Sequence, residues 1–332
     1  MLAGLCGRAF RPADDELTSV DPERMALLAR RHRVQGLVHP ALASRGVEVL
    51  AGDARTIALD VLRSAAASRE LRDRFAQAGI PLLFLKGLPV GKLAYGDPTP
   101  KMSADLDVLV RPADLLRAAH LLQEAGFVPI LPPSRDRLPA WHRRFKESVW
   151  QRDGAPLLEL HTALTDNPAL LNGLQPFTAT REVQVLPGLV LPTLAPTEQF
   201  AYLAVHGASS AWFRLKWLCD FAALVPRDAA SLEALTERSL TLGAGRAVAC
   251  ALLLSRRLFG TVLPGQLLPD RATRILTRLA LRQLQAVREP TRRPLGTLGI
   301  HGSQLLLRAG PRFALVEALR QAGDLLARRR LA

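Results

Sequence analysis

Two short apolar segments constrain the fold of this chain more than any other feature. The first, LLFLKG (82–87), ends at Lys86-Gly87, and the second, DLDVLV (105–110), carries Asp105 and Asp107. Successive side chains of a strand alternate between its faces, so both aspartates are expected on one face and the apolar residues on the other. Two neighbouring carboxylates in an apolar strand are unfavourable unless a positive charge compensates them. The pattern therefore predicts two strands with a cation site on the second.

A third carboxylate extends this candidate site. The segment PLLELH (156–161) is typical of a short buried strand, in which Glu159 and His161 share a face. Carboxylate oxygens suit Mg²⁺ or Mn²⁺, which also bridge the phosphates of a nucleoside triphosphate. Two acids on one strand and one on a neighbour can hold two such cations. The alternatives are that the aspartates are surface residues beside a turn and that Glu159 pairs with a nearby arginine.

Several motifs together resemble a known family. LKG, KMSADLDVLV, EAGF and ELH occur in this order and are followed by HGASSAWFRLKWLCDFAALV (206–225). They resemble the uncharacterised nucleotidyltransferase family of the polymerase-beta-like superfamily, over roughly residues 25–225. The resemblance implies an α+β fold, in which a small mixed β-sheet nucleotidyltransferase core with helices is flanked by N-terminal and C-terminal helical regions. It also implies transfer of a nucleoside monophosphate from an NTP to an unknown acceptor, which is a small molecule, a peptide or a protein.

The resemblance assigns roles to individual residues. Asp105, Asp107 and Glu159 are expected to be the catalytic acids and the ligands of Mg²⁺ or Mn²⁺. The residues expected to contact the nucleotide are Lys86, Gly87, Lys101, Ser103 and His161. The chain has Lys101 where the family often has arginine, and lysine keeps the charge but lacks the bidentate fork. For His161, a structural role at the end of a strand is the alternative to phosphate or proton binding.

Length and composition favour a folded protein of several domains. The 332 residues are 48% apolar, which is enough for two or three domains with cores. We expect an N-terminal helical region (1–78), a nucleotidyltransferase-like core (79–195) and a C-terminal helical domain (196–332). No apolar run is long enough to span a bilayer and no signal region is evident, so a cytoplasmic location is expected. Cys6, Cys219 and Cys250 give no metal motif or disulfide framework.

The positive charge of the chain is concentrated near its C-terminal end. The net charge is +14, and residues 256–332 contain 15 arginines and four acidic residues. One interpretation is a surface that binds a polyanion such as nucleic acid or anionic lipid. The other is a solvated face produced by a general bias toward arginine, since only five of the 44 basic residues are lysine.

Periodicity predicts the order of the secondary-structure elements. Helices are expected across 21–78 and after Pro196, and residues 289–311 are expected to form a mobile linker. The strands expected between them are 81–85, 105–110, 127–131, 144–151, 156–161, 182–186 and 189–192. The Asp153-Gly154 turn predicts a hairpin between two of these strands. In the segment 206–225, His206, Trp212 and Trp217 are either core residues or part of a helix that offers His206 or Lys216 to the triphosphate.

Two functions remain open at this level. The first is a metal-dependent nucleotidyltransferase, in which Lys86 and Lys101 neutralise developing negative charge. The second is a non-catalytic protein of the same fold that binds a polyanion or a partner protein through its basic C-terminal helices. The three acids favour the enzyme, and the lack of a hydroxyl after Gly87 favours the binding protein.

Overall fold

A computed structural model describes residues 21–293 and 295–331 of the chain. Its contacts divide the chain into two compact units, and neither is one continuous segment. Of the described residues, the first unit contains those up to Arg55, the short segment Ala169–Leu174 and the helical region from Thr197 to Ala318. The second unit contains Thr56–Pro168, Gln175–Pro196 and the described residues from Leu319 onward.

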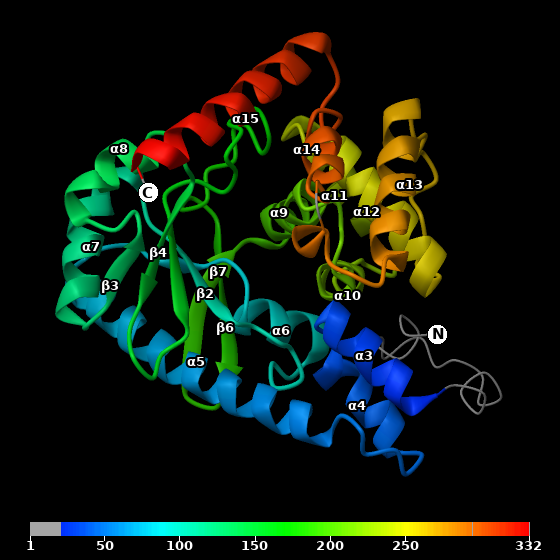
Figure 1. Ribbon diagram of the computed structural model, residues 1–332, viewed down its shortest axis with the longest axis horizontal. Helices are drawn as coiled ribbons and strands as arrows, with labels where there is room; N and C mark the ends of the chain where they lie inside the picture. The colour runs from blue at the N-terminus through cyan, green and yellow to red at the C-terminus, as the bar shows by residue number, and fades with distance from the viewer. Residues whose placement is uncertain (1–20, 294, 332) are drawn as a thin grey trace. The chain divides into compact units, whose positions relative to one another are not determined.

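A mixed sheet of five strands forms the centre of the second unit (Figure 1). In spatial order the strands are β1 (Leu83–Phe84), β2 (Asp105–Leu109), β5 (Leu157–His161), β4 (Glu147–Gln151) and β3 (Val128–Leu131). Strands β2 and β5 are parallel, whereas every other neighbouring pair is antiparallel. The hairpin predicted between β4 and β5 is confirmed, and Gly154 has the positive φ of 75° that such a tight turn requires.

One face of this sheet is apolar and packs against two helices. Leu106, Val108, Leu158 and Leu160 share a buried cluster with residues of α5 (Ala51–Gln77) and α7 (Leu115–Glu124) (Figure 1). Each fully buried side chain of this size stabilises the fold by about 1.5–3 kcal/mol. Because side chains alternate along a strand, the residues between these leucines and valines project from the opposite face. That opposite face carries the acidic residues of β2 and β5.

A two-stranded hairpin extends the second unit beside β1. It consists of β6 (Thr180–Leu186) and β7 (Leu189–Leu194), joined at Gly188, and it contains the two strands predicted at 182–186 and 189–192. The Thr193 hydroxyl donates a hydrogen bond of 2.6 Å to the carbonyl oxygen of Phe84, which ties β7 to β1. Helix α6 (Leu88–Tyr95) follows β1 directly and packs against β6. The short helix α8 (Leu138–His142) precedes β4.

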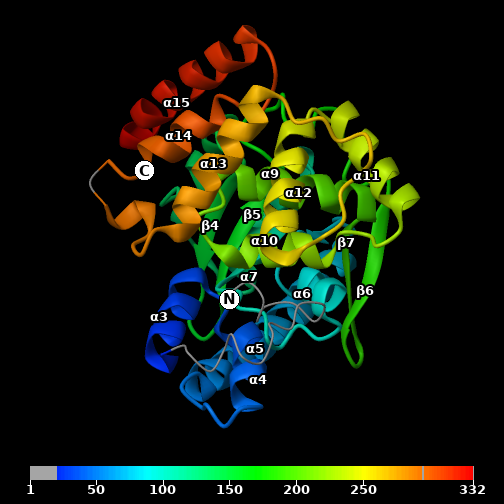
Figure 2. The same cartoon turned by 90° about the vertical axis from the view of Figure 1, so that its right-hand side faces the viewer.

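Helices make up the first unit (Figure 2). They are α3 (Pro22–His32), α4 (Gln35–Ala43), α9 (Pro196–Ser209), α10 (Leu215–Ala223), α11 (Ala229–Thr241), α12 (Gly245–Phe259), α13 (Arg271–Gln285) and α14 (Leu298–Gln304). Helix α12 contacts α10, α11 and α13, and its Cys250 is buried, which raises the pKa of that thiol to about 12. Helix α15 (Pro311–Leu331) is divided between the two units. Among the described residues, no helix combines the length and apolar character needed to cross a bilayer.

The aromatic residues of the segment 206–225 pack against one another. The rings of His206 and Trp217 lie 5.6 Å apart with perpendicular planes, and Trp212 is almost completely buried. A side chain at Gly207 would place its Cβ 2.3 Å from the Trp212 ring, so this position requires glycine. These contacts support the prediction that the segment contributes to a core.

The prediction of a mobile linker at 289–311 is wrong. This stretch contains helix α14, and Ile300, Ser303 and Leu307 are buried. The glycines and prolines suggested irregular structure, but the apolar residues between them find partners in the tertiary fold. Ile300, for example, packs in a small cluster with Ala211 and Phe213, which lie far away in the sequence.

His32 lies buried among helices of the first unit. Its Nδ1 accepts a hydrogen bond of 3.2 Å from the backbone N–H of Leu215, and the backbone of Leu284 accepts a hydrogen bond from the ring. These bonds hold the neutral imidazole. Burial, followed by the nearby Arg31 guanidinium, lowers the pKa of His32 to about 4.

We therefore expect His32 to make stability depend on pH. The unfolded state takes up a proton below pH ~6.5, whereas the folded state resists protonation until pH ~4, so stability falls as the pH falls through this window. The loss between pH 7 and 4.5 should be about 2–3 kcal/mol from this residue. Urea unfolding at both pH values should show a smaller difference for His32→Gln than for the wild type. An equal difference in the two proteins would contradict this assignment.

Candidate active site

The pairing of β2 with β5 places two carboxylates side by side. In the parallel register Asp107 is opposite Glu159, and Leu109 is opposite His161. The flanking residues Leu106 and Val108 are buried on the apolar face, which fixes the strand with Asp107 on the other face. Two acids that are distant in the sequence therefore lie on adjacent strands of one sheet face.

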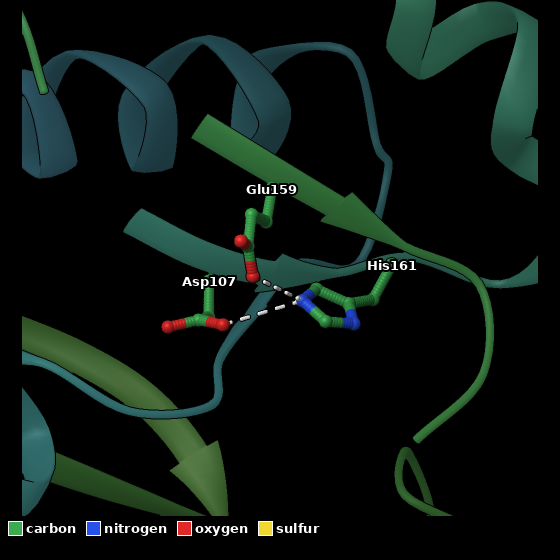
Figure 3. A group of neighbouring side chains, drawn as sticks. All are labelled: Asp107, Glu159 and His161. Carbon is green, nitrogen blue, oxygen red and sulfur yellow. Dashed lines mark ion pairs between the residues drawn. The ribbon is translucent and has the colours of Figure 1, made fainter. Parts of the chain in front are cut away.

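His161 brings a third ligand atom to these carboxylates (Figure 3). Its Nε2 lies 3.3 Å from Asp107 Oδ1 and 3.6 Å from Glu159 Oε2. One ligand atom from each of Asp107, Glu159 and His161 lies within 4.8 Å of the others, and we call these three residues the acid–histidine cluster. Asp107 and His161 are buried, whereas Glu159 keeps about a quarter of its side chain exposed (24%).

Lys86 supplies a positive charge to the cluster. Its Nζ lies 2.6 Å from Asp107 Oδ1, and only 16% of the lysine side chain is exposed. The backbone explains this placement, because the N–H of Leu85 donates a hydrogen bond of 2.9 Å to the carbonyl oxygen of Asp107. Leu85, the residue after β1, is thus held beside the middle of β2, and Lys86 follows it directly.

Glu147 and Lys146 complete the charged environment. Glu147 is opposite His161 in the antiparallel pairing of β4 with β5, and its Oε2 lies 3.4 Å from His161 Nδ1. Lys146 forms an ion pair with Glu147. Three acids and three basic side chains therefore neutralise one another on this face of the sheet.

The electrostatic balance of the site follows from these contacts. Burial alone would raise the pKa of Asp107, but Lys86 and His161 outweigh it and hold this pKa well below the usual range. Burial and the Lys146 ammonium oppose protonation of His161, yet Glu147, Asp107 and Glu159 outweigh them and raise its pKa. Burial and the neighbouring carboxylates raise the pKa of Glu159. Glu159 is therefore the acid of the cluster most able to accept a proton.

The other residues predicted for the site lie nearby in the chain but outside the cluster. Asp105 is half-buried at the start of β2 and is not one of the three clustered residues. Gly87, Lys101 and Ser103 line one cavity of about 10 Å³, which holds a water molecule at most. Ser103 donates a hydrogen bond of 3.1 Å to the carbonyl oxygen of Asp105. Gly87 precedes α6 with a φ of 64°, and no side chain caps this helix.

Glu147 and Lys146 are not among the site residues predicted from the sequence. A signal was present, because a hairpin centred on Gly154 pairs residues whose numbers are equidistant from the turn, and 147 and 161 are such a pair. The Asp153-Gly154 turn, however, located the hairpin but not its register, because a two-residue turn at these positions would pair residue 146, and not Glu147, with His161.

The cluster has the chemistry of a divalent-cation site. Both ring nitrogens of His161 are buried and make no hydrogen bond of regular geometry, which is unusual for a buried polar group. The donor set is two carboxylates and one imidazole, and such a set suits divalent metal ions. The residues present thus fit a bound metal.

These observations define the class of protein. A small mixed sheet with helices on one face and clustered carboxylates on the other is consistent with a nucleotidyltransferase core. The profile of the uncharacterised nucleotidyltransferase family matches residues 18–260, and the chain belongs to this family. No curated protein matches the chain.

Because Lys86 and His161 are balanced by Asp107, we expect Asp107→Asn to destabilise the metal-free protein. Without Lys86 and His161, loss of one of several neighbouring carboxylates would relieve repulsion. Loss of a buried ion-pair partner should instead cost about 1–3 kcal/mol, reduced from the fully buried value because Lys86 can reach solvent. Thermal unfolding in a chelating buffer measures the effect.

The exposed pair Arg63–Asp60 provides the control for this prediction. Asp60→Asn should change stability by less than ~0.5 kcal/mol. The double variant Lys86→Met/Asp107→Asn should recover part of the loss, because it removes both charges together. If Asp107→Asn is as stable as the wild type, the ion pair with Lys86 contributes nothing to the fold.

Proposed function

We propose that the protein is a Mg²⁺- or Mn²⁺-dependent nucleotidyltransferase. It moves a nucleoside monophosphate from an NTP to an acceptor and releases pyrophosphate. The observation that carries the proposal is the placement of Asp107 opposite Glu159 on adjacent strands, with Lys86 beside them, in a chain of this family. The acceptor is a small molecule, a peptide or a protein with a free hydroxyl or phosphate.

In this proposal Asp105, Asp107 and Glu159 hold the metal ions. A bound divalent ion would neutralise the triphosphate and lower the pKa of the attacking group. Asp105 is included because it precedes Asp107 by two residues at the start of the same strand. The protein residues must fix the triphosphate so that its α-phosphorus faces the acceptor oxygen.

The start of α6 favours binding of the triphosphate. Lys86 precedes the helix, no side chain caps its first turn, and Gly87 has a backbone conformation open to few other residues. The N-terminus of a helix attracts anions because its backbone N–H groups and dipole are positive. A triphosphate beside Asp107 would meet both this helix end and the Lys86 ammonium.

Glu159 is the proposed proton acceptor. The acceptor oxygen forms a bond to the α-phosphorus while the bond from that phosphorus to the bridging oxygen of pyrophosphate breaks. The proton of the acceptor hydroxyl passes to a Glu159 carboxylate oxygen. Glu159 suits this role because about a quarter of its side chain (24%) is exposed, so an acceptor can approach its carboxylate.

We expect Asp107→Asn and Glu159→Gln each to lower turnover by at least about 100-fold, since several kcal/mol of charge stabilisation are lost. The assay mixes α-labelled NTPs with Mg²⁺ or Mn²⁺ and panels of small-molecule, peptide and protein acceptors, and it follows label transfer and pyrophosphate. Turnover is expressed per folded molecule. Glu182→Gln, which removes an exposed carboxylate of β6, is the matched control and should keep full activity. Full activity of Asp107→Asn would refute the assignment.

A second candidate function is binding of a polyanion through α13. Arg271, Arg274, Arg278 and Arg282 are exposed on this helix, and no ion pair is found for them within the described part of the chain. Their spacing of three or four residues keeps them near one face of the helix. Arginines without acidic partners leave a positive surface available to phosphates. This function is compatible with the enzyme as well as with a non-catalytic protein.

Charge reversal tests this second candidate. Arg274→Glu, Arg278→Glu and Arg282→Glu together should weaken binding to RNA, DNA or anionic vesicles, and wild-type binding should fall steeply with salt because each neutralised phosphate releases counterions. Fluorescence anisotropy between low and physiological salt measures both effects. NTP binding should be unchanged in this variant. Absent or salt-independent binding in the wild type would leave these arginines as a solvated face.

A further inference from the structure

The position of His161 is unusual for a histidine that only supports a strand. Its side chain is fully buried, yet it is surrounded by the carboxylates of Asp107, Glu159 and Glu147 (Figure 3 shows the first two). Neither ring nitrogen forms a hydrogen bond of regular geometry. A buried structural histidine normally satisfies both nitrogens, as His32 does in the first unit. The site therefore offers an imidazole nitrogen aimed at two carboxylates.

The two distances from His161 Nε2 match those of ligands around one ion. His161 Nε2 lies 3.3 Å from Asp107 Oδ1 and 3.6 Å from Glu159 Oε2. Two ligand atoms that each lie about 2.2 Å from a metal are about 3.1 Å apart at an octahedral right angle and about 3.6 Å apart at a tetrahedral angle. Little movement of these side chains is needed to bind an ion, although Lys86 must give up its contact with Asp107 Oδ1.

Glu147 lies beside the ring nitrogen of His161 that faces away from the cluster. Histidines that bind metals usually donate their other N–H to a carboxylate, which fixes the tautomer and the ring orientation. Glu147 Oε2 lies 3.4 Å from His161 Nδ1, on the opposite side of the ring from the cluster. The β4–β5 register places Glu147 directly opposite His161, so the arrangement is built into the hairpin.

We propose that His161 Nε2 is a metal ligand together with Asp107 and Glu159, and that Glu147 positions the ring through Nδ1. The site then selects a divalent transition-metal ion, for which Mn²⁺ is the probe, over Mg²⁺. Imidazole is a ligand of first-row transition metals, whereas Mg²⁺ prefers oxygen ligands and keeps its waters. Mn²⁺ binds nitrogen-containing sites most weakly of that series, so it is a stringent probe. This inference deepens the proposed function, on which it rests for the role of the metal in nucleotide transfer.

Mn²⁺ added to the metal-free full-length protein, without nucleotide, tests the proposal. Electron spin echo modulation of bound Mn²⁺ should show coupling to a directly bound nitrogen nucleus. Calorimetry should show that Mn²⁺ binds at least about tenfold more tightly than Mg²⁺. Both measurements use the wild-type protein, so the test does not depend on a variant that folds.

Variants then identify the residue whose nitrogen binds Mn²⁺. His161→Gln should abolish the nitrogen coupling and weaken Mn²⁺ binding by at least about tenfold, with a smaller effect on Mg²⁺. Glu147→Gln should retain the coupling but weaken Mn²⁺ binding by about 10–100-fold, as expected of a positioning residue. The matched controls are His120→Gln and Glu124→Gln, which alter an exposed histidine–glutamate pair on α7 and should have no effect.

Two outcomes would overturn the inference. One is Mn²⁺ bound by the wild-type protein without nitrogen coupling, and the other is unchanged Mn²⁺ affinity in a folded His161→Gln variant. Either result leaves the proposed function standing if Asp107→Asn still abolishes transfer from NTP. Conversely, nitrogen coupling that depends on His161, in a protein that transfers no nucleotide, would support this metal site and refute the proposed function.

Discussion

The parallel pairing of β2 with β5 is the contact on which the candidate site depends. It sets Asp107 opposite Glu159 and brings His161 level with the end of β2. The register is held from the other side of the sheet, where Leu106, Val108, Leu158 and Leu160 are buried against α5 and α7. A slip of one residue would move these apolar side chains out of the core, so hydrophobic burial on one face secures the acids on the other.

Charge compensation makes this face of the sheet possible. Buried carboxylates are costly unless they are paired, and here Lys86, His161 and Lys146 lie beside Asp107, Glu159 and Glu147. The same carboxylates would also be balanced by a bound divalent ion. A divalent ion bound in place of the Lys86 contact would supply more positive charge to these carboxylates than the single ammonium does. Family membership, the paired acids and the uncapped start of α6 together support nucleotide transfer as the function.

Local sequence patterns predicted much of this arrangement. The period-two alternation in DLDVLV and PLLELH gave the strands and the faces of Asp107 and Glu159, and Gly154 marked the hairpin that joins β4 to β5. The prediction of a linker at 289–311 was wrong for a physical reason. Glycine and proline describe local backbone preference, whereas the burial of Ile300 and Leu307 is decided by side chains that are distant in the sequence.

The sequence by itself determined which residues could share a strand face, because alternation along a strand is a local property of the backbone. Beyond the hairpin of β4 with β5, it could not determine which strands become neighbours. A parallel pair needs a long crossover, and here α7, β3 and β4 intervene between β2 and β5. Only the tertiary structure decided that Lys86 would pair with Asp107 and that Glu147 would lie beside Nδ1 of His161. It also decided that the chain would form two units from interleaved segments, because the packing of distant apolar surfaces, and not local periodicity, sets such boundaries.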